Sequence, residues 1–273
     1  MLERRIPASG EPLPAVGLGT WQTFDVGGGA EERAPLAEVL RRFLSGGGAV
    51  VDSSPMYGRS ESVVGDLLAE VSASARPFLA TKVWTTGRAA AEGQLRDSLR
   101  HLRASRLDLL QVHNLLDWET HLPVMRSWKE QGRIRYLGVT HYSLSAFPLL
   151  EKLLRTERLD FVQLPYSLAT REAEKRLLPA AADAGAAVLV MRPFEEGALF
   201  RAAIGKSLPS WANEAGASSW AQFFLKYILS HKAVTCVLPA TSSPAHLAEN
   251  LAAGGGDFPD ERLRRRMVDE FRR

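Results

Sequence analysis

Residues 49–71 read AVVDSSPMYGRSESVVGDLLAEV and contain a strand-like run, a loop and a helix-like stretch in succession. The apolar run Ala49–Asp52 is typical of a strand in a parallel sheet. The stretch Glu61–Val71 has apolar residues at the three-to-four-residue spacing of an amphipathic helix. One such unit cannot bury its own apolar surface, so the fold depends on how often the unit recurs.

The same unit recurs along the whole chain. Short apolar or β-branched runs predict strands at Ala15–Leu18, Ala49–Asp52, Phe78–Lys82, Leu107–His113, Arg135–Val139, Phe161–Leu164, Ala187–Met191 and Thr235–Leu238. Stretches of helical period predict helices at Glu31–Leu44, Glu61–Val71, Ala90–Leu102, Trp118–Gln131, Leu144–Leu154, Arg171–Ala184, Ser218–Leu229 and Pro244–Ala252. Eight pairs in about 250 residues match a closed (β/α)8 barrel. We therefore expect an α/β fold, a TIM barrel forming a single domain over residues 1–273, with a C-terminal helical tail.

The main alternative is an open, doubly wound sheet that binds a dinucleotide. Such a sheet usually carries G-x-G-x-x-G between its first strand and first helix. Here the first strand leads into Gly17-Leu18-Gly19-Thr20-Trp21, which lacks the third glycine and opens no helix. The closed barrel is therefore the favoured architecture.

The composition excludes several classes of protein. The single cysteine, Cys236, cannot form an internal disulfide, and its apolar run Ala233–Leu238 indicates a structural thiol in a reducing compartment. Residues 1–7 lack the apolar core of a signal peptide, and no apolar run is long enough to span a bilayer. We expect a cytoplasmic protein without a membrane partner.

The charges favour no polyanionic partner. The 34 basic and 31 acidic residues give a net charge of +3, and they are interspersed. The densest basic cluster, Arg262–Arg266, lies among acidic residues, with Leu263, Met267 and Phe271 recurring every four residues. This pattern predicts a docked terminal helix with a solvated face, and we expect no nucleic-acid partner.

Four reactive side chains follow three consecutive predicted strands. Asp52, Lys82 and His113 each end a strand, and Tyr57 lies in the loop after Asp52. The C-terminal ends of barrel strands converge on one mouth, so these groups should meet there. Each of these four residues could have an ordinary structural role by itself. Packing alone, however, does not require all four to occur together.

These residue types suit proton delivery to a carbonyl group. A phenol titrates near 10, so we expect the Lys82 cation to lower the pKa of Tyr57, and Asp52 to keep the lysine charged. His113 would orient the carbonyl or share the proton. The set lacks a nucleophile and a metal cage, so the hydride must come from a cofactor.

The sequence resembles the aldo-keto reductases, as a bacterial-type member, over essentially its whole length. The matching segments are Gly17–Trp21, Val51–Gly58 with Ser60-Glu61, Thr81-Lys82, Gln111–His113, Gly132–Thr140, Gln163 and Leu238–Asn250. The resemblance implies an NAD(P)H-dependent oxidoreductase that reduces an aldehyde or ketone to an alcohol. It implies that Asp52, Tyr57, Lys82 and His113 are catalytic, with Tyr57 the general acid.

The resemblance also implies a cofactor site for NADPH, with NADH as the alternative. The residues implied are Gly19, Thr20, Trp21, Asp52, Thr140, His141, Gln163, Arg192, Thr241, Ser242, Ser243, His246, Glu249 and Asn250. Three positions depart from the family pattern. Thr140-His141 replaces Ser-Asn, Met191–Phe194 replaces the tyrosine that stacks on the nicotinamide, and His246 stands where a basic residue commonly meets the 2′-phosphate.

The substrate pocket should be walled by aromatic residues. The candidates are Trp21, Tyr57, Trp84, His113 and Trp118, together with the irregular segment Phe194–Trp211. Such walls suit an apolar carbonyl compound, whereas Arg192, Glu195 and Glu196 at the rim would select a polar one. We expect a small-molecule substrate and a monomer or weak homo-oligomer.

The sequence leaves two alternative functions. A metal hydrolase would use His113, Asp117 and His121, but the strand–helix boundary at Trp118 separates these residues, so we expect no metal. A cofactor-binding sensor or regulatory subunit with slow turnover is the alternative function, because the nicotinamide contacts are altered. His101, His121 and His231 fall in helical contexts and are interpreted as surface or packing residues.

Overall fold

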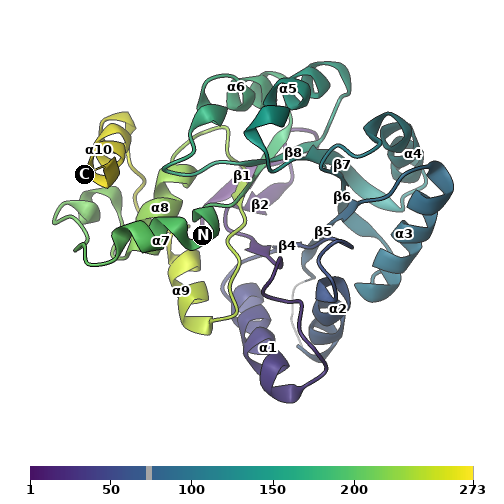
Figure 1. Ribbon diagram of the computed structural model, residues 1–273, viewed down its shortest axis with the longest axis horizontal. Coiled ribbons are helices and arrows are strands. Elements are labelled where there is room, and N and C mark those ends of the chain that lie inside the picture. The colour runs from purple at the N-terminus through teal and green to yellow at the C-terminus, as the bar shows by residue number, and fades with distance from the viewer. Residues whose placement is uncertain (72–75, 273) are drawn as a thin grey trace.

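A ring of parallel strands forms the centre of the computed structural model, which describes residues 1–71 and 76–272 (Figure 1). The strands follow chain order: β3 (Leu18–Gly19), β4 (Val50–Asp52), β5 (Phe78–Val83), β6 (Leu107–His113), β7 (Ile134–Thr140), β8 (Phe161–Pro165), β9 (Ala187–Met191) and β10 (Cys236–Val237). Two parallel bridges, Val16 with Val237 and Gly19 with Ala240, join the first strand to the last. The predicted (β/α)8 barrel is confirmed.

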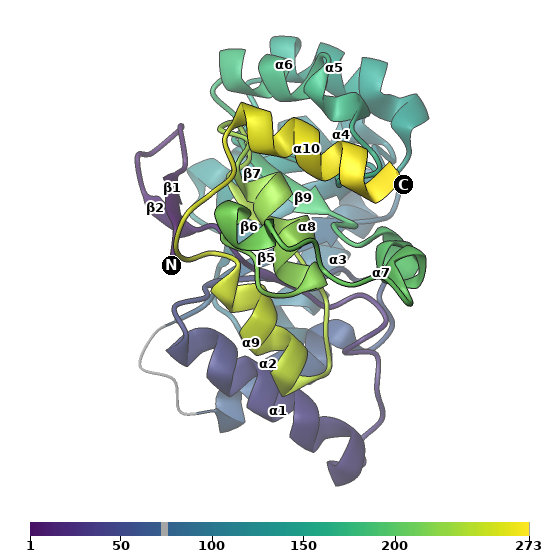
Figure 2. The ribbon, with the colours of Figure 1, turned by 90° about the vertical axis from the view of Figure 1, so that its left-hand side faces the viewer.

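Helices surround the ring on the outside (Figures 1 and 2). They are α1 (Ala30–Ser45), α2 (Ser60–Glu70), α3 (Arg88–His101), α4 (Trp118–Glu130), α5 (Phe147–Thr156), α6 (Leu177–Asp183), α8 (Trp220–Leu229) and α9 (Pro244–Ala252). Among the described residues, no helix is long and apolar enough to cross a membrane. All eight predicted helical regions contain a helix. In two of them a separate 3-10 turn comes first, at Leu144–Ala146 and Glu172–Glu174.

An N-terminal hairpin that the sequence did not indicate covers one end of the barrel. Strands β1 (Glu3–Arg5) and β2 (Pro12–Pro14) pair antiparallel, and each is only three residues long. Ile6, which follows β1, and Leu13, within β2, are buried in a cluster with residues from the barrel interior, including Phe78 and the fully buried Cys236. The hairpin closes the end of the barrel opposite the C-terminal strand ends.

The segment after β9 contains more structure than its composition indicates. It forms a 3-10 turn at Glu195–Gly197, helix α7 (Ala198–Ala203) and a second turn at Ala212–Ala215. Arg192, Glu195 and Glu196 have positive φ angles of 53°, 51° and 53°, which side-chain-bearing residues seldom adopt. Such local strain is often retained at functional sites.

Helix α10 (Glu261–Arg272) is docked against the outside of the barrel (Figure 2). Leu263 and Met267 are buried, as their spacing predicted. Arg264 is buried as well, with 8% of its side chain exposed, although it belongs to the expected solvated cluster. Its guanidinium donates to Glu174 Oε1 at 2.7 Å and to the hydroxyl of Tyr166 at 2.9 Å. The helix is therefore anchored by a charged contact as well as by apolar packing.

We expect Arg264→Ala to lower the free energy of unfolding by roughly 2–3 kcal/mol, because it leaves the Glu174 carboxylate without its cation. Urea denaturation followed by circular dichroism measures this loss. Arg265→Ala, one exposed position further along α10, is the matched control and should change stability by less than about 0.5 kcal/mol. Equal losses in the two variants would contradict an anchoring role for Arg264.

Candidate active site

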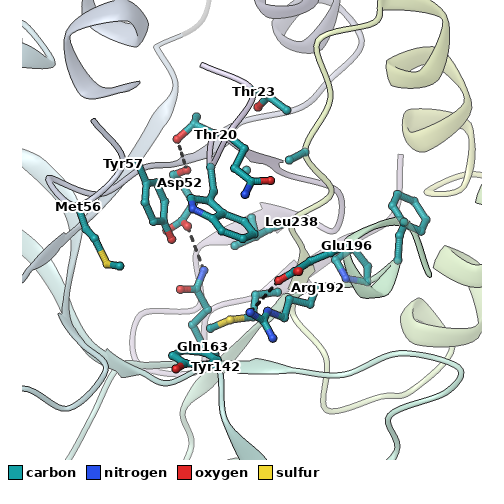
Figure 3. Close-up of a pocket in the computed structure, with 18 of the residues that line it drawn as sticks. Thr20, Thr23, Asp52, Met56, Tyr57, Tyr142, Gln163, Arg192, Glu196 and Leu238 are labelled. Atoms are coloured by element: carbon teal, nitrogen blue, oxygen red, sulfur yellow. Dashed lines mark hydrogen bonds and ion pairs between the residues drawn. The ribbon is translucent and has the colours of Figure 1, made fainter. Parts of the chain in front are cut away.

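The strand register brings three of the four predicted reactive residues to the same end of the barrel. Asp52 is the last residue of β4, Lys82 lies next to the end of β5, and His113 is the last residue of β6. Tyr57 reaches them from the loop between β4 and α2, and Figure 3 shows its ring beside Asp52. The four side chains therefore lie together at one end of the barrel, as their positions after the strands predicted.

Lys82 and Asp52 form a buried ion pair at the base of the site. Lys82 Nζ lies 2.7 Å from Asp52 Oδ2, and it also donates to the carbonyl of Ser53 at 2.6 Å. Their side chains are 1% and 6% exposed. Burial by itself would lower the pKa of Lys82, but the charge of Asp52 and the oxygen of Tyr57 outweigh it, so this pKa is raised. The lysine is therefore a permanent cation at neutral pH.

Tyr57 lies directly over this cation. Lys82 Nζ is 5.0 Å from the centroid of the phenol ring. Burial raises the pKa of Tyr57 above its ordinary value near 10, Lys82 opposes that rise, and Asp52 adds to it. This net direction differs from the expected one, because the sequence could not show how deeply the phenol is buried. At neutral pH the hydroxyl is protonated and available as a donor.

His113 faces Tyr57 from the next strand. Their ring centroids are 5.8 Å apart and the rings meet edge to face. Burial, with the charge of Lys82, lowers the pKa of His113 to about 3. Its Nδ1 atom lies 2.9 Å from the hydroxyl of Ser54, a contact that the sequence does not indicate. The imidazole is therefore neutral and its orientation is fixed.

Two amide side chains complete the surroundings of Asp52. Gln163 Nε2 donates to Asp52 Oδ2 at 3.1 Å, and Gln111 Nε2 donates to Oδ1 at 3.3 Å. Thr140 Oγ1 in turn donates to Gln163 Oε1 at 3.0 Å. Gln163 and Thr140, predicted as cofactor contacts, are thus connected to the ion pair through hydrogen bonds.

A cavity of about 590 Å³ opens above these groups (Figure 3). Of the predicted residues, it is lined by Gly19, Thr20, Trp21, Asp52, Tyr57, His113, Gln163 and Arg192. Its other walls include the apolar side chains of Met56, Tyr142, Phe194, Phe200 and Leu238. Of these five, only Phe194 and Phe200 fall in the segment expected to form a wall. Met56 and Tyr142 could have been found from their positions next to Tyr57 and His141.

Two predicted wall residues do not line this cavity. The backbone of Trp84 makes two hydrogen bonds to the side chain of Gln94 on α3, and the residue is 42% exposed. Trp118 begins α4 and packs against the apolar layer between strands and helices. The direction of each tryptophan side chain is set by the contacts of its own loop. It therefore could not be predicted from the spacing of the tryptophans in the sequence.

His141 and Arg192, which depart from the family pattern, belong to a connected group at the rim. Arg192 Nη2 pairs with Glu196 Oε1 at 2.7 Å, and the guanidinium lies 4.9 Å from the centroid of the Tyr142 ring (Figure 3). The His141 ring stacks on Tyr142 with centroids 5.3 Å apart, while its Nδ1 accepts from the backbone of Ser143. The Arg192–Glu196 ion pair thus lies at the cavity wall.

The segment predicted to bind adenosine follows β10 and leads into α9. Ser243 caps the helix by accepting from the backbone N–H of His246 at 3.4 Å, and Thr241 accepts from the N–H of Ser243 at 3.0 Å. Thr241 and Asn250 are buried, whereas Ser242 and His246 are exposed. Glu249 is half-buried on the same helix. Exposed groups at this helix N-terminus are suited to a phosphate.

The residues of the metal alternative lie in separate environments. Asp117 accepts from the backbone of Gly87 at 2.7 Å, and the ring of His121 contacts the carbonyl of Thr85 at 2.7 Å. Within the described ranges, no three metal-ligating side chains meet. His101 is partly exposed on α3, and His231 is half-buried beside Tyr166, in agreement with a surface and a packing role.

Comparison with known proteins agrees with this geometry. The family model "Aldo/keto reductase family" matches residues 15–266. Methylglyoxal reductase YeaE of Escherichia coli is 30% identical over 260 residues, which cover 92% of this chain and 89% of the relative. An aldo-keto reductase from Klebsiella pneumoniae, solved in complex with NADPH, is 26% identical, with a TM-score of 0.82 over 99% of this chain and 96% of that one. The match confirms the resemblance inferred from the motifs: the chain belongs to the aldo/keto reductase family.

Proposed function

We propose that the protein reduces an aldehyde or ketone to an alcohol, with NADPH as hydride donor and Tyr57 as general acid. The observation that carries this proposal is the Lys82 ammonium held between the Asp52 carboxylate and the Tyr57 ring. The carbonyl oxygen would accept a hydrogen bond from the Tyr57 hydroxyl. The nearby cation would stabilise the phenolate that forms when the proton is transferred.

Neutral His113 would assist by orienting the carbonyl. An imidazolium in this position would place a second positive charge near Lys82, and burial disfavours that charge. Ser54 holds the ring through Nδ1, which leaves Nε2 for the substrate. Tyr57 and His113 would therefore contact the carbonyl oxygen from two sides, and Lys82 and Asp52 would act through Tyr57.

The residues around the cavity fit a nicotinamide dinucleotide. Gln163 offers an amide at the cavity wall beside Asp52, Thr140 holds that amide in place, and Gly19 lines the same cavity without a side chain. Arg192 and the capped start of α9 offer donors for phosphates. When bound, the cofactor supplies the hydride. The choice of NADPH as the cofactor of this protein is supported by relatives solved with NADPH or NADP.

The walls of the cavity point to a small, largely apolar carbonyl compound. Trp21, Met56 and Phe200 belong to its mostly apolar lining, and its polar members are the groups around Asp52, the Arg192–Glu196 pair, and Gln22, Thr23 and Asn114. The relative named methylglyoxal reductase adds 2-oxoaldehydes to the compounds worth assaying. Tight binding of NADPH without reduction of any aldehyde or ketone would instead favour the sensor alternative.

Tyr57→Phe should lower kcat for aldehyde reduction by roughly 10²–10⁴-fold, because it removes the proton donor and keeps the ring. The Kd for NADPH, measured by tryptophan fluorescence, should stay within about twofold. Tyr136→Phe is the matched control, since its hydroxyl bonds Ser9 and Glu11 beside the N-terminal hairpin. Equal kcat in the parent and Tyr57→Phe would exclude the mechanism.

The depressed pKa of His113 should make the protein less stable in acid. Because the unfolded imidazole titrates near 6.5 and the folded one near 3, protons bind the unfolded state preferentially between these values. The parent should therefore lose up to about 1.4 kcal/mol of unfolding free energy for each pH unit below 6.5. Urea denaturation from pH 6.5 to 4.5 should show a shallower decline for His113→Gln. Parallel curves would contradict a buried neutral imidazole.

His246→Arg should increase selectivity for NADPH over NADH by about tenfold, because a guanidinium can bind a 2′-phosphate through two hydrogen bonds. The exposed position at the start of α9 gives the longer side chain room. Fluorescence titration with both cofactors measures the change, and NADH, which lacks that phosphate, is the internal control. An equal gain for both cofactors would place His246 away from the 2′-phosphate.

A further inference from the structure

One buried side chain next to the ion pair has no role in the proposed mechanism. Gln111 is fully buried in β6, and its Cα is paired with that of Lys82 on β5, so both side chains point into the barrel. On its other side the register partner is Gly138, which has no side chain. The Gln111 amide therefore lies inside the barrel directly beside the Lys82–Asp52 pair.

The hydrogen bonds of Asp52 are divided unequally between its two oxygens. Oδ2 accepts from Lys82 at 2.7 Å and from Gln163 at 3.1 Å. Oδ1 accepts from Gln111 at 3.3 Å, and this is the one contact recorded for that oxygen within the described part of the chain. Gln111 is thus the group that opposes rotation of the carboxylate about its own axis.

The amide of Gln111 can face Asp52 in one orientation only. Its Nε2 donates to the carboxylate, whereas the reversed amide would set Oε1 against a negative oxygen. In the orientation present, Oε1 is buried without a hydrogen-bond partner. A leucine or methionine would fill this space without such an unsatisfied acceptor. The amide at this position is therefore explained by its hydrogen bond to Asp52 and not by packing.

We propose that Gln111 is a positioning residue for the reaction: by holding Asp52 Oδ1, it keeps Oδ2 against Lys82 and so keeps Lys82 beneath Tyr57. This inference rests on the proposed function. Gln111 touches neither the cavity nor the reacting atoms, so its effect passes through Asp52 and Lys82. The step affected is proton delivery, and binding of the carbonyl compound is left unchanged.

The first test is Gln111→Met, which keeps the volume and removes the donor. We expect kcat for a good aldehyde substrate to fall about tenfold, while KM for the aldehyde and Kd for NADPH stay within about twofold. Leu109→Met, a volume-conserving change two residues earlier on the same face of β6, is the matched control and should keep kcat. Thermal unfolding of all variants establishes that they are folded.

The second test is Gln111→Glu, which can donate to Asp52 only while its carboxyl group is protonated. The titratable groups around this position are Asp52, which Gln111 contacts, Lys82 on the neighbouring strand, Tyr57 and His113 beside that pair, and the buried Cys236, which is affected by the charge of Asp52. The parent shares all of them. We expect kcat of this variant, divided by that of the parent, to rise several-fold as the pH falls from 8 to 5. The same ratio for Gln111→Met should not depend on pH.

The outcomes separate the two proposals. If the parent reduces no aldehyde or ketone, or if Tyr57→Phe is fully active, the proposed function is contradicted. If the parent is active but Gln111→Met retains its kcat, or raises KM in place of lowering kcat, the positioning role alone is contradicted. A pH-independent ratio for Gln111→Glu would contradict it as well.

Discussion

The site depends on a single buried ion pair, Lys82 with Asp52. An ammonium group in a barrel interior would lose its proton or disrupt the fold unless a carboxylate and further acceptors surround it. Asp52 and the Ser53 carbonyl meet that requirement at 2.7 and 2.6 Å. Because the partners come from β4 and β5, the pair can form only when the register between those strands is correct.

The ion pair also sets the charge of the groups above it. Tyr57 and His113, which lie next to the pair, are both neutral at physiological pH, since burial raises the first pKa and lowers the second. The positive charge of Lys82 stays beneath the phenol ring and out of the cavity lining. In the proposed mechanism this arrangement would favour proton donation from Tyr57, because a full charge would then develop only where the lysine can stabilise it.

The outer part of the cavity follows different constraints. Its walls come from loops, chiefly from the segment after β9, where three residues with positive φ angles turn the chain around the Arg192–Glu196 pair. In barrels of this kind, chemistry is determined at the strand ends and substrate choice by the loops that follow them. His141 and Arg192, which depart from the family pattern, therefore alter the rim of the cavity and leave the Lys82–Asp52 ion pair intact.

The sequence by itself determined the repeated strand–helix unit, the closed barrel and the grouping of Asp52, Tyr57, Lys82 and His113, because these follow from periodicity and from the ends of strands. It did not indicate the N-terminal hairpin, whose two strands are three residues long and owe their stability to burial of Ile6 and Leu13. Only the tertiary structure decided that burial outweighs Lys82 in setting the pKa of Tyr57, that Trp84 and Trp118 lie outside the cavity, and that Gln111 contacts Asp52. Desolvation, loop direction and contacts between strands distant in sequence arise from the packed three-dimensional arrangement, and the local pattern of residues does not contain them.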